Sequence, residues 1–244
     1  MENAYQELKA AQIYTEFLAS PNGQIQQKIL EKAILAALPD SKESVILDAA
    51  CGNGWLANNL KPRFPKTYAC DSSAILIAIG KSNYPAVEFS QTDLQKNLPY
   101  PDGFFDAVIL NMAAPDISDL SAAIKNLAAK TKPGGKFIMT IPNPYYSFPA
   151  AVWKRTIWDF LMRRKPKLTI GDGYFGKKNI LREFNGQKIA SNFYTLDDYL
   201  SAAASANLCL EKITELKSQK GSPRFDLNYQ MFRYPLILLL EFHK

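Results

Sequence analysis

Short apolar runs alternate with segments of helical periodicity along most of this 244-residue sequence. Strands are predicted where the apolar runs lie, at Val45–Leu47, Thr67–Cys70, Val87–Ser90, Phe105–Leu110 and Lys136–Ile141. Helices are predicted between them, at Trp55–Leu60, Ala74–Lys81 and Leu120–Ala129. Strands that alternate with helices predict a parallel sheet with helices on both faces.

The two ends of the chain complete this pattern. Residues 5–38 are predicted to form two helical pieces, interrupted at Ser20-Pro21-Asn22-Gly23. Thr195-Leu196-Asp197-Asp198 is a helix start of the capping-box type, with Asp replacing the usual Glu. The segments that follow it are a helix to about Asn207, a strand at Leu208–Ile213, a loop over 217–228 and a strand over Met231–Phe242.

The alternation is absent from residues 142–190, which are irregular and rich in aromatic and basic residues. This segment is predicted to be an insertion, acting as a lid, between the fifth and sixth strands of one sheet. Within it, Phe148–Lys167 has apolar residues that can share one stripe on a helix, with basic residues beside it. Four interpretations remain open: a helix packed over the sheet, a lid over an apolar or aromatic substrate, an RNA contact, and a membrane-surface contact for a lipid-soluble substrate such as a quinone precursor.

Composition and charge restrict the possible partners and cellular location of the protein only slightly. A net charge of +6 permits an acidic substrate, a nucleic acid or an anionic membrane as partner, without requiring one. Cys51, Cys70 and Cys209 form no metal or disulfide pattern, which favours the cytoplasm. We expect no bound metal. The run near 235–240 is too short to span a bilayer, and no signal-peptide pattern precedes the first helix.

The candidate site begins with Val45-Ile46-Leu47-Asp48-Ala49-Ala50-Cys51-Gly52-Asn53-Gly54. This stretch predicts a strand, a tight glycine turn and a helix start that offers free N–H groups to a ligand. Acidic residues follow the next two strands, Asp71 and then Asp93, and Asn111 ends the fourth strand. Because ligands bind at the carboxyl ends of parallel strands, these residues are expected to share one crevice.

A dinucleotide enzyme is one alternative interpretation. Gly52-x-Gly54-x-x-Ala57 fits the NAD pattern, and Asp71 follows at the distance of a ribose-binding acid. Asp48 opposes this interpretation, because an acid beside a pyrophosphate would repel it. Tyr174-x-x-x-Lys178 resembles a reductase pair, but the glycine pattern of those enzymes is absent, and we treat the match as chance.

The arrangement resembles the class I S-adenosylmethionine-dependent methyltransferases, in particular their small-molecule branch. The residues that carry the resemblance are Val45–Gly54 (with Ala50 where glycine is more usual), Phe104–Ile109, Lys132–Phe137 and Thr195–Leu200. It implies an α/β, Rossmann-like fold with a seven-stranded, mostly parallel sheet whose last strand is antiparallel. It also implies one domain, with a helical cap at 1–40, a cofactor-binding core at 41–143, a lid at 144–190 and a C-terminal part of the same sheet at 191–244.

The resemblance further implies roles for individual residues. Gly52 and Gly54 would line the methionine part of S-adenosylmethionine, Asp48 would act near its amino group, and Asp71 would accept both ribose hydroxyls. Asp93 would accept from the adenine amino group. The other residues expected to bind the cofactor, or its product S-adenosylhomocysteine, are Tyr14, Ala50, Asn53, Ser72, Leu94 and Asn111.

The acceptor chemistry is less defined by the sequence. The single histidine, His243, is the penultimate residue, and we interpret it as a strand-end residue. Asn143 occupies the region after the fifth strand where related enzymes often have histidine. The candidate catalytic residues are Asn143, Tyr145, Tyr146 and Asp116.

The sequence thus predicts a methyltransferase for a small, aromatic or apolar metabolite, acting as a monomer or homodimer. An RNA methyltransferase that uses the basic tract is a weaker alternative, because nucleic acid is a possible but not a favoured partner. A non-catalytic cofactor-binding protein is another alternative.

Overall fold

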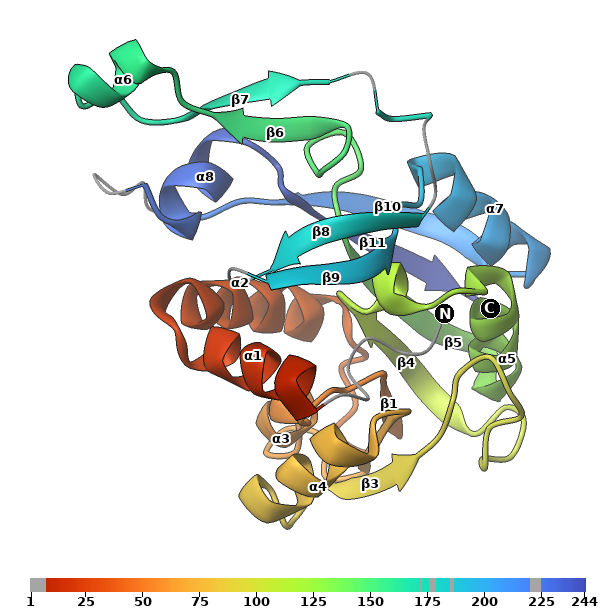
Figure 1. Ribbon diagram of the computed structural model, residues 1–244. Helices are drawn as coiled ribbons and strands as arrows, with labels where there is room; N and C mark the ends of the chain where they lie inside the picture. The colour runs from red at the N-terminus through yellow and green to blue at the C-terminus, as the bar shows by residue number, and fades with distance from the viewer. Residues whose placement is uncertain (1–7, 172, 176–178, 185–186, 220–224) are drawn as a thin grey trace.

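The computed structural model describes residues 8–171, 173–175, 179–184, 187–219 and 225–244 (Figure 1). The proposed start of the first helix at Tyr5, and Lys178 of the reductase-like pair, lie outside these residues. A seven-stranded sheet forms the centre, in the order β10-β11-β5-β4-β1-β2-β3. Its strands are β1 (Ile46–Ala49), β2 (Thr67–Asp71), β3 (Glu88–Gln91), β4 (Phe105–Asn111), β5 (Thr131–Pro142), β10 (Cys209–Leu216) and β11 (Ile237–His243).

The sheet is parallel except for its last strand. β11 lies between β5 and β10 and is antiparallel to both, whereas β1 is parallel to β2 and β4. The predicted fold class, a mostly parallel sheet with an antiparallel last strand, is therefore confirmed. The carboxyl ends of the neighbouring strands β1, β2 and β4 meet at one edge of the sheet.

Helices cover both faces of the sheet, because successive residues of a strand point to opposite sides. Leu47 packs in one buried cluster with α5 and α7, whereas Ile46 packs in another with α2, α3 and α8. The helices are α1 (Leu8–Ala19), α2 (Pro21–Ala37), α3 (Trp55–Leu60), α4 (Ala74–Asn83), α5 (Leu120–Lys130), α6 (Ile157–Leu161), α7 (Leu196–Ser205) and α8 (Leu227–Arg233), with a 3-10 turn, η2 (Ala114–Asp116).

Capping residues fix several of the predicted boundaries. The Ser20 side chain accepts from the Gly23 N–H, which starts α2 after the predicted interruption. Thr195 and Asp198 form the predicted capping box of α7. The last predicted strand is wrong at its start, because α8 occupies its first residues and the strand begins only at Ile237.

The insertion lies between β5 and β10, as predicted, but its conformation differs from the expectation. The amphipathic helix considered for 148–167 is wrong: β6 (Ala151–Lys154) and β7 (Lys167–Ile170) form an antiparallel hairpin, with the short α6 at its tip. A second hairpin follows, made by β8 (Asn179–Phe184) and β9 (Gln187–Asn192). The first hairpin projects away from the sheet, and the second lies above α1 and α2 in Figure 1.

Candidate functional site

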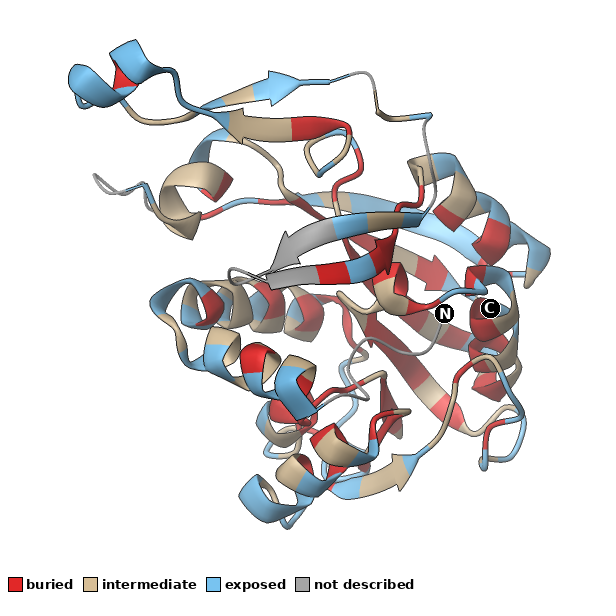
Figure 2. Ribbon diagram, in the orientation of Figure 1, coloured by how far each residue is buried: buried red, intermediate tan, exposed pale blue. Residues whose placement is uncertain are grey.

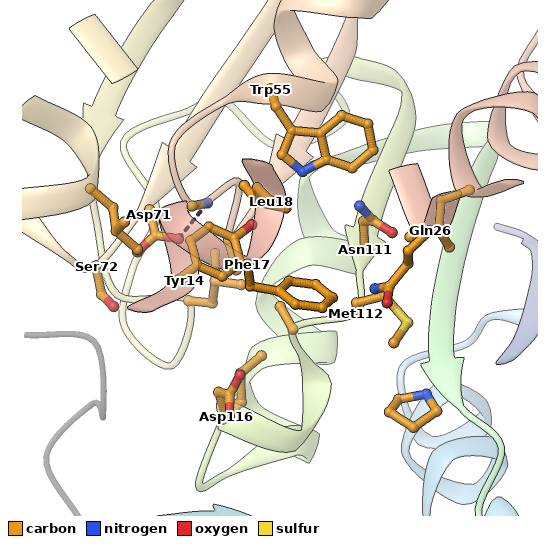
Figure 3. A pocket seen from close by; sticks show the side chains of 18 of the residues that line it. Tyr14, Phe17, Leu18, Gln26, Trp55, Asp71, Ser72, Asn111, Met112 and Asp116 are labelled. Carbon is orange, nitrogen blue, oxygen red and sulfur yellow. Dashed lines mark hydrogen bonds between the residues drawn. The ribbon is translucent and has the colours of Figure 1, made fainter. Parts of the chain in front are cut away.

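A cavity of about 720 Å³ opens at the carboxyl ends of β1, β2 and β4. Its walls come from the loops after these strands and from α1, α2 and the start of α8 (Figure 3). The residues predicted from the sequence that line it are Tyr14, Ala50, Gly52, Asp71, Ser72, Asp93, Leu94, Asn111 and Asp116. The sheet therefore brings together side chains from distant parts of the chain, as the strand-end argument predicts.

The loop between β1 and α3 turns through left-handed backbone. Ala50, Gly52 and Gly54 have φ angles of 52°, 59° and 78°. A Cβ on Gly52 would lie 2.8 Å from the Tyr14 hydroxyl, so only glycine lets the Tyr14 ring lie against the loop. The N-terminal helix thereby closes directly over the glycine turn.

Asp71 ends β2 and is buried at the cavity wall. Its Oδ2 accepts the Gly52 N–H at 2.8 Å, and its Oδ1 accepts the Ser73 N–H at 2.8 Å. Burial raises the pKa of this carboxyl to about 6, although both hydrogen bonds favour the charged form. Each oxygen retains capacity for a further donor from the cavity.

Asp48 occupies a different position from the one expected. It is buried beneath the loop, where its Oδ2 accepts the Ala57 N–H of α3 at 3.1 Å, and it is not among the described residues that line the cavity. Desolvation raises its pKa to about 7, and nearby Asp71 adds to the shift. Its visible contact is therefore with the first turn of α3, and a role near an amino group stays a prediction.

The remaining predicted binding residues also divide into those that line the cavity and those that only shape the loop beneath it. Asp93 lines the cavity and accepts from the Gln95 N–H at 3.0 Å, while Asn111 lines it and accepts from the Thr140 hydroxyl at 2.7 Å. Asn53 is buried and accepts the Trp55 N–H at 3.3 Å. Asn53 and Gly54 therefore shape the loop, without lining the cavity that the described residues form.

Of the four candidate catalytic residues, Asp116 alone lines the cavity formed by the described residues. Asn143 is buried, donates to the Pro235 carbonyl and accepts the Tyr145 N–H, so its side chain links β5 to the start of β11. Tyr145 stacks on Tyr174 with the ring centroids 4.8 Å apart. Tyr146 packs against Tyr234.

Other cavity residues were not anticipated. They come from the N-terminal helices, from α3, from the strand ends and from the C-terminal region, and include Phe17, Leu18, Gln26, Gln27, Leu30, Trp55, Gln91, Leu227, Leu236 and Ile237. Local patterning gives little signal for them, because it shows that a helix has an apolar face but not what that face covers. Phe17 and Gln26 are seen around the cavity in Figure 3.

Comparison with known proteins identifies the family to which this chain belongs. A family model described as a methyltransferase domain matches residues 22–212, more than half of the chain. The chain belongs to this methyltransferase family. The resemblance drawn from the glycine loop and the strand-end acids is thus confirmed.

Individual relatives agree with the family. A malonyl-[acyl-carrier protein] O-methyltransferase of Buchnera aphidicola subsp. Baizongia pistaciae is 29% identical over 222 residues, 86% of each chain. A demethylmenaquinone methyltransferase of Streptomyces griseus subsp. griseus is 28% identical over 142 residues, 58% of this chain. That match spans 60% of the relative's own length.

A solved structure supports the fold. An S-adenosylmethionine-dependent methyltransferase from Mesorhizobium loti superposes with a TM-score of 0.70 at 19% identity, covering 90% of this chain and all of its own. This methyltransferase domain therefore has the class I fold. Within the described residues, no helix is both long and apolar enough to cross a bilayer, and no group of side chains suits a metal ion.

Proposed function

We propose that this protein transfers the methyl group of S-adenosylmethionine to a small, apolar or aromatic acceptor. The observation that carries the proposal is the position of Asp71. A buried carboxylate at the end of β2, already oriented by the Gly52 and Ser73 N–H groups, faces a cavity large enough for a nucleoside and a second small molecule. Such a carboxylate suits a ribose, because its two oxygens can accept from two adjacent hydroxyls.

The residues present fit the adenosyl cofactor on physical grounds. Asp93 and Leu94 add an acceptor and an apolar side chain beyond Asp71, which suits an adenine ring. The Gly52 backbone lets the Tyr14 ring lie against the loop at the cavity wall. When bound, the cofactor supplies a methyl group on a positively charged sulfur.

The acceptor end of the proposed site has apolar side chains beside the polar Gln26 and Gln27 of α2. Leu30 of α2, Leu227 of α8 and Ile237 of β11 line the cavity on elements separate from the acidic strand ends. Apolar walls favour an apolar or aromatic acceptor and exclude water from its nucleophile. Holding the acceptor in line for displacement is the main task of the chain, and good orientation contributes about 7–11 kcal/mol to lowering a barrier.

Asp116 is the best candidate for taking a proton from the acceptor. It lies on η2 at the cavity wall (Figure 3), close enough to Asp71 for its charge to raise the pKa of that carboxyl. If Asp116 is the base, Asp116→Asn should lower kcat by about 10²–10⁴-fold without lowering cofactor affinity, because the lost charge is one that raises the pKa of Asp71. Steady-state kinetics with the identified acceptor measure the change in kcat, and calorimetry with S-adenosylhomocysteine measures cofactor affinity. An unchanged kcat would remove Asp116 from this role.

Calorimetric titration with S-adenosylhomocysteine, S-adenosylmethionine and NAD tests the proposal. We expect micromolar affinity for the two adenosyl ligands and none for NAD. In Asp71→Ala, loss of hydrogen bonds to a charged acceptor should weaken adenosyl binding by roughly tenfold to a hundredfold. Asp40→Asn, which changes an exposed acid far from the cavity, is the matched control.

Two results would contradict the proposal. NAD binding without adenosyl binding would make the chain a dinucleotide protein. Wild-type affinity in a folded Asp71→Ala variant would show that the ribose is held elsewhere. Circular dichroism of the variant separates the second result from simple unfolding.

A further inference from the structure

The tip of the β6–β7 hairpin exposes a cluster of large apolar side chains to solvent. Figure 1 shows α6 at the far end of this hairpin, away from the central sheet, and Figure 2 shows the same segment as mostly exposed. The apolar tip consists of Ile157, Trp158, Phe160, Leu161 and Met162, whose exposed fractions are 62–69%. Such a concentration of large apolar side chains in one short segment differs from the scattered surface apolar residues that an ordinary monomer shows.

The tip has a defined local structure that turns these side chains outward. Thr156 and Asp159 form a capping box at the start of α6: the Thr156 hydroxyl accepts the Asp159 N–H, and the Asp159 carboxylate accepts from the Thr156 N–H and hydroxyl. Asp159 is thereby buried, and it is the only acidic residue between Lys154 and Lys167. The exposed surface of the tip is therefore apolar and free of negative charge from its own segment.

Basic residues flank the apolar tip on both sides along the chain. Lys154 and Arg155 precede it, Arg163 and Arg164 follow it, and all four are exposed. Behind them a second cavity, of about 460 Å³, lies between the hairpin and α8 and has Arg163, Arg164, Lys165, Lys167 and Arg233 in its wall with three aromatic residues. Lys165 lies 4.0 Å from the centre of the Tyr229 ring, and this contact holds the segment between α6 and β7 against α8.

We propose that this surface, the apolar tip of α6 with its flanking cations, docks the protein on an anionic lipid bilayer. Burying apolar side chains at the interface removes them from water, while Lys and Arg near the headgroups are attracted to negative lipid. Charge complementarity selects this occupant. The flanking cations match the anionic headgroups of the bilayer, and the apolar tip matches its apolar interior. The tip lies on the surface and does not span the membrane.

The docking surface is continuous with the acceptor side of the cavity through α8. Leu227, at the start of this helix, lines the main cavity, whereas Tyr229 and Arg233 line the basic cavity beneath the hairpin. A membrane-bound orientation would therefore place the bilayer near the apolar wall of the main cavity. The inference rests on the hairpin and on α8, and it goes beyond the proposed methyl transfer.

Vesicle co-sedimentation of the full chain tests the proposal. One set of vesicles is phosphatidylcholine alone, and the other contains added phosphatidylglycerol. We expect binding to the mixed vesicles, weaker binding to phosphatidylcholine, and a loss of binding at high salt. The variant Ile157→Ser/Trp158→Ser/Leu161→Ser should bind at least roughly tenfold more weakly, and Leu210→Ser, an exposed apolar residue on β10, is the control.

Fluorescence distinguishes insertion from simple adsorption. Of the three tryptophans, Trp55 is buried in the core, Trp153 packs its ring against Phe225 and Tyr234, and Trp158 is 68% exposed at the tip. Mixed vesicles should shift the emission to the blue, and Trp158→Phe should remove that shift while it preserves binding.

Three outcomes would overturn the proposal: no binding to either vesicle, binding that the triple variant retains, or a dimer that the triple substitution dissociates without any vesicle binding. The last outcome would make the tip an interface between two copies of this chain. Adenosyl-ligand calorimetry on the triple variant is unaffected by these outcomes, so failure here leaves the proposed function standing.

Discussion

At the residue scale, two buried carboxylates illustrate how environment separates roles. Asp48 and Asp71 end neighbouring strands, and burial raises the pKa of each, to about 7 and about 6. Asp71 faces the cavity, whereas Asp48 accepts from the first turn of α3. The same residue type near the ends of two strands therefore lines the cavity in one case and accepts from a helix N–H in the other.

The raised pKa of Asp48 predicts a dependence of stability on pH. The unfolded chain releases this proton near the ordinary aspartate pKa of 3.8, whereas the folded chain keeps it until about 7. The ionised carboxylate therefore costs the folded state increasing free energy as pH rises through this window. Asp48→Asn removes the titration, so its stability relative to wild type should grow by roughly 2–3 kcal/mol from pH 5 to pH 8.

Urea denaturation of both proteins at the two pH values measures this difference. Asp40→Asn, at an exposed position, should show a small change by comparison. A pH-independent difference between wild type and Asp48→Asn would show that Asp48 titrates normally.

The pKa of Asp71 predicts a pH dependence of ligand binding. A ribose would donate to the ionised carboxylate, so affinity for S-adenosylhomocysteine should fall as pH decreases through about 6. Calorimetry between pH 5 and pH 8 measures it. Asp71→Asn should bind more weakly at pH 8 and lose the dependence around pH 6, and a retained dependence would assign it to another group.

At the element scale, the insertion shows why apolar spacing is an ambiguous signal. A short apolar run fits a helix stripe or a strand equally well. Trp153 instead pairs in a strand with Leu168 and packs its ring against Phe225 and Tyr234. Pro166 also opposes a continuous helix, because it lacks an N–H and its ring clashes with the preceding turn. The aromatic partners that stabilise the strand, Phe225 and Tyr234, lie far from Trp153 in the sequence.

The packing of α4 against the glycine loop gives a prediction with an unusual sign. Gly80 lies within α4, where Ala normally stabilises a helix by about 1 kcal/mol. Here a Cβ would lie 2.7 Å from the Phe89 ring and 2.8 Å from the Asn53 carbonyl oxygen. We expect Gly80→Ala to destabilise the protein by about 1–3 kcal/mol in thermal or urea unfolding.

Gly134→Ala provides a comparison for this prediction, because no atom lies within 4 Å of the added Cβ, although its φ of 73° brings strain of its own. Stabilisation by Gly80→Ala would show that α4 can move away from the loop. It would also show that the Phe89 contact does not fix the glycine loop.

At the scale of the whole molecule, the cavity lies between the central sheet and a helical cover that includes α1. α1 contributes only Ala11 and Ile13 to the buried residues, yet Tyr14, Phe17 and Leu18 form part of the cavity wall. Elements with few buried residues open at low free energy. The cover over the proposed cofactor site is therefore expected to be the part that a ligand stabilises most.

Hydrogen exchange with and without S-adenosylhomocysteine tests this expectation. Ligand at about 100 times its Kd should stabilise the protein by about 2.7 kcal/mol overall. Protection should be largest in α1 and in the loop between β1 and α3, with little change in the β6–β7 hairpin, whose residues do not line the described cavity. Equal protection of the hairpin would show that it closes over the ligand as a lid.

The sequence by itself determined the sheet, most of its helices and the acidic strand ends. Hydrophobic periodicity and capping are local signals, and parallel topology forces strand ends to meet. The seven-stranded arrangement, the insertion between β5 and β10, and the gathering of Gly52, Asp71 and Asp93 at one cavity follow from these signals.

Only the tertiary structure decided which residues face that cavity. The burial of Asp48 beneath the loop, the use of Asn143 as a bridge to Pro235, and the contribution of α1, α2 and α8 all depend on contacts between segments far apart in the chain. The hairpin with its exposed tip depends on pairing and packing of the same kind. Such contacts leave no local pattern, because their free energy arises from partners that only the folded chain brings together.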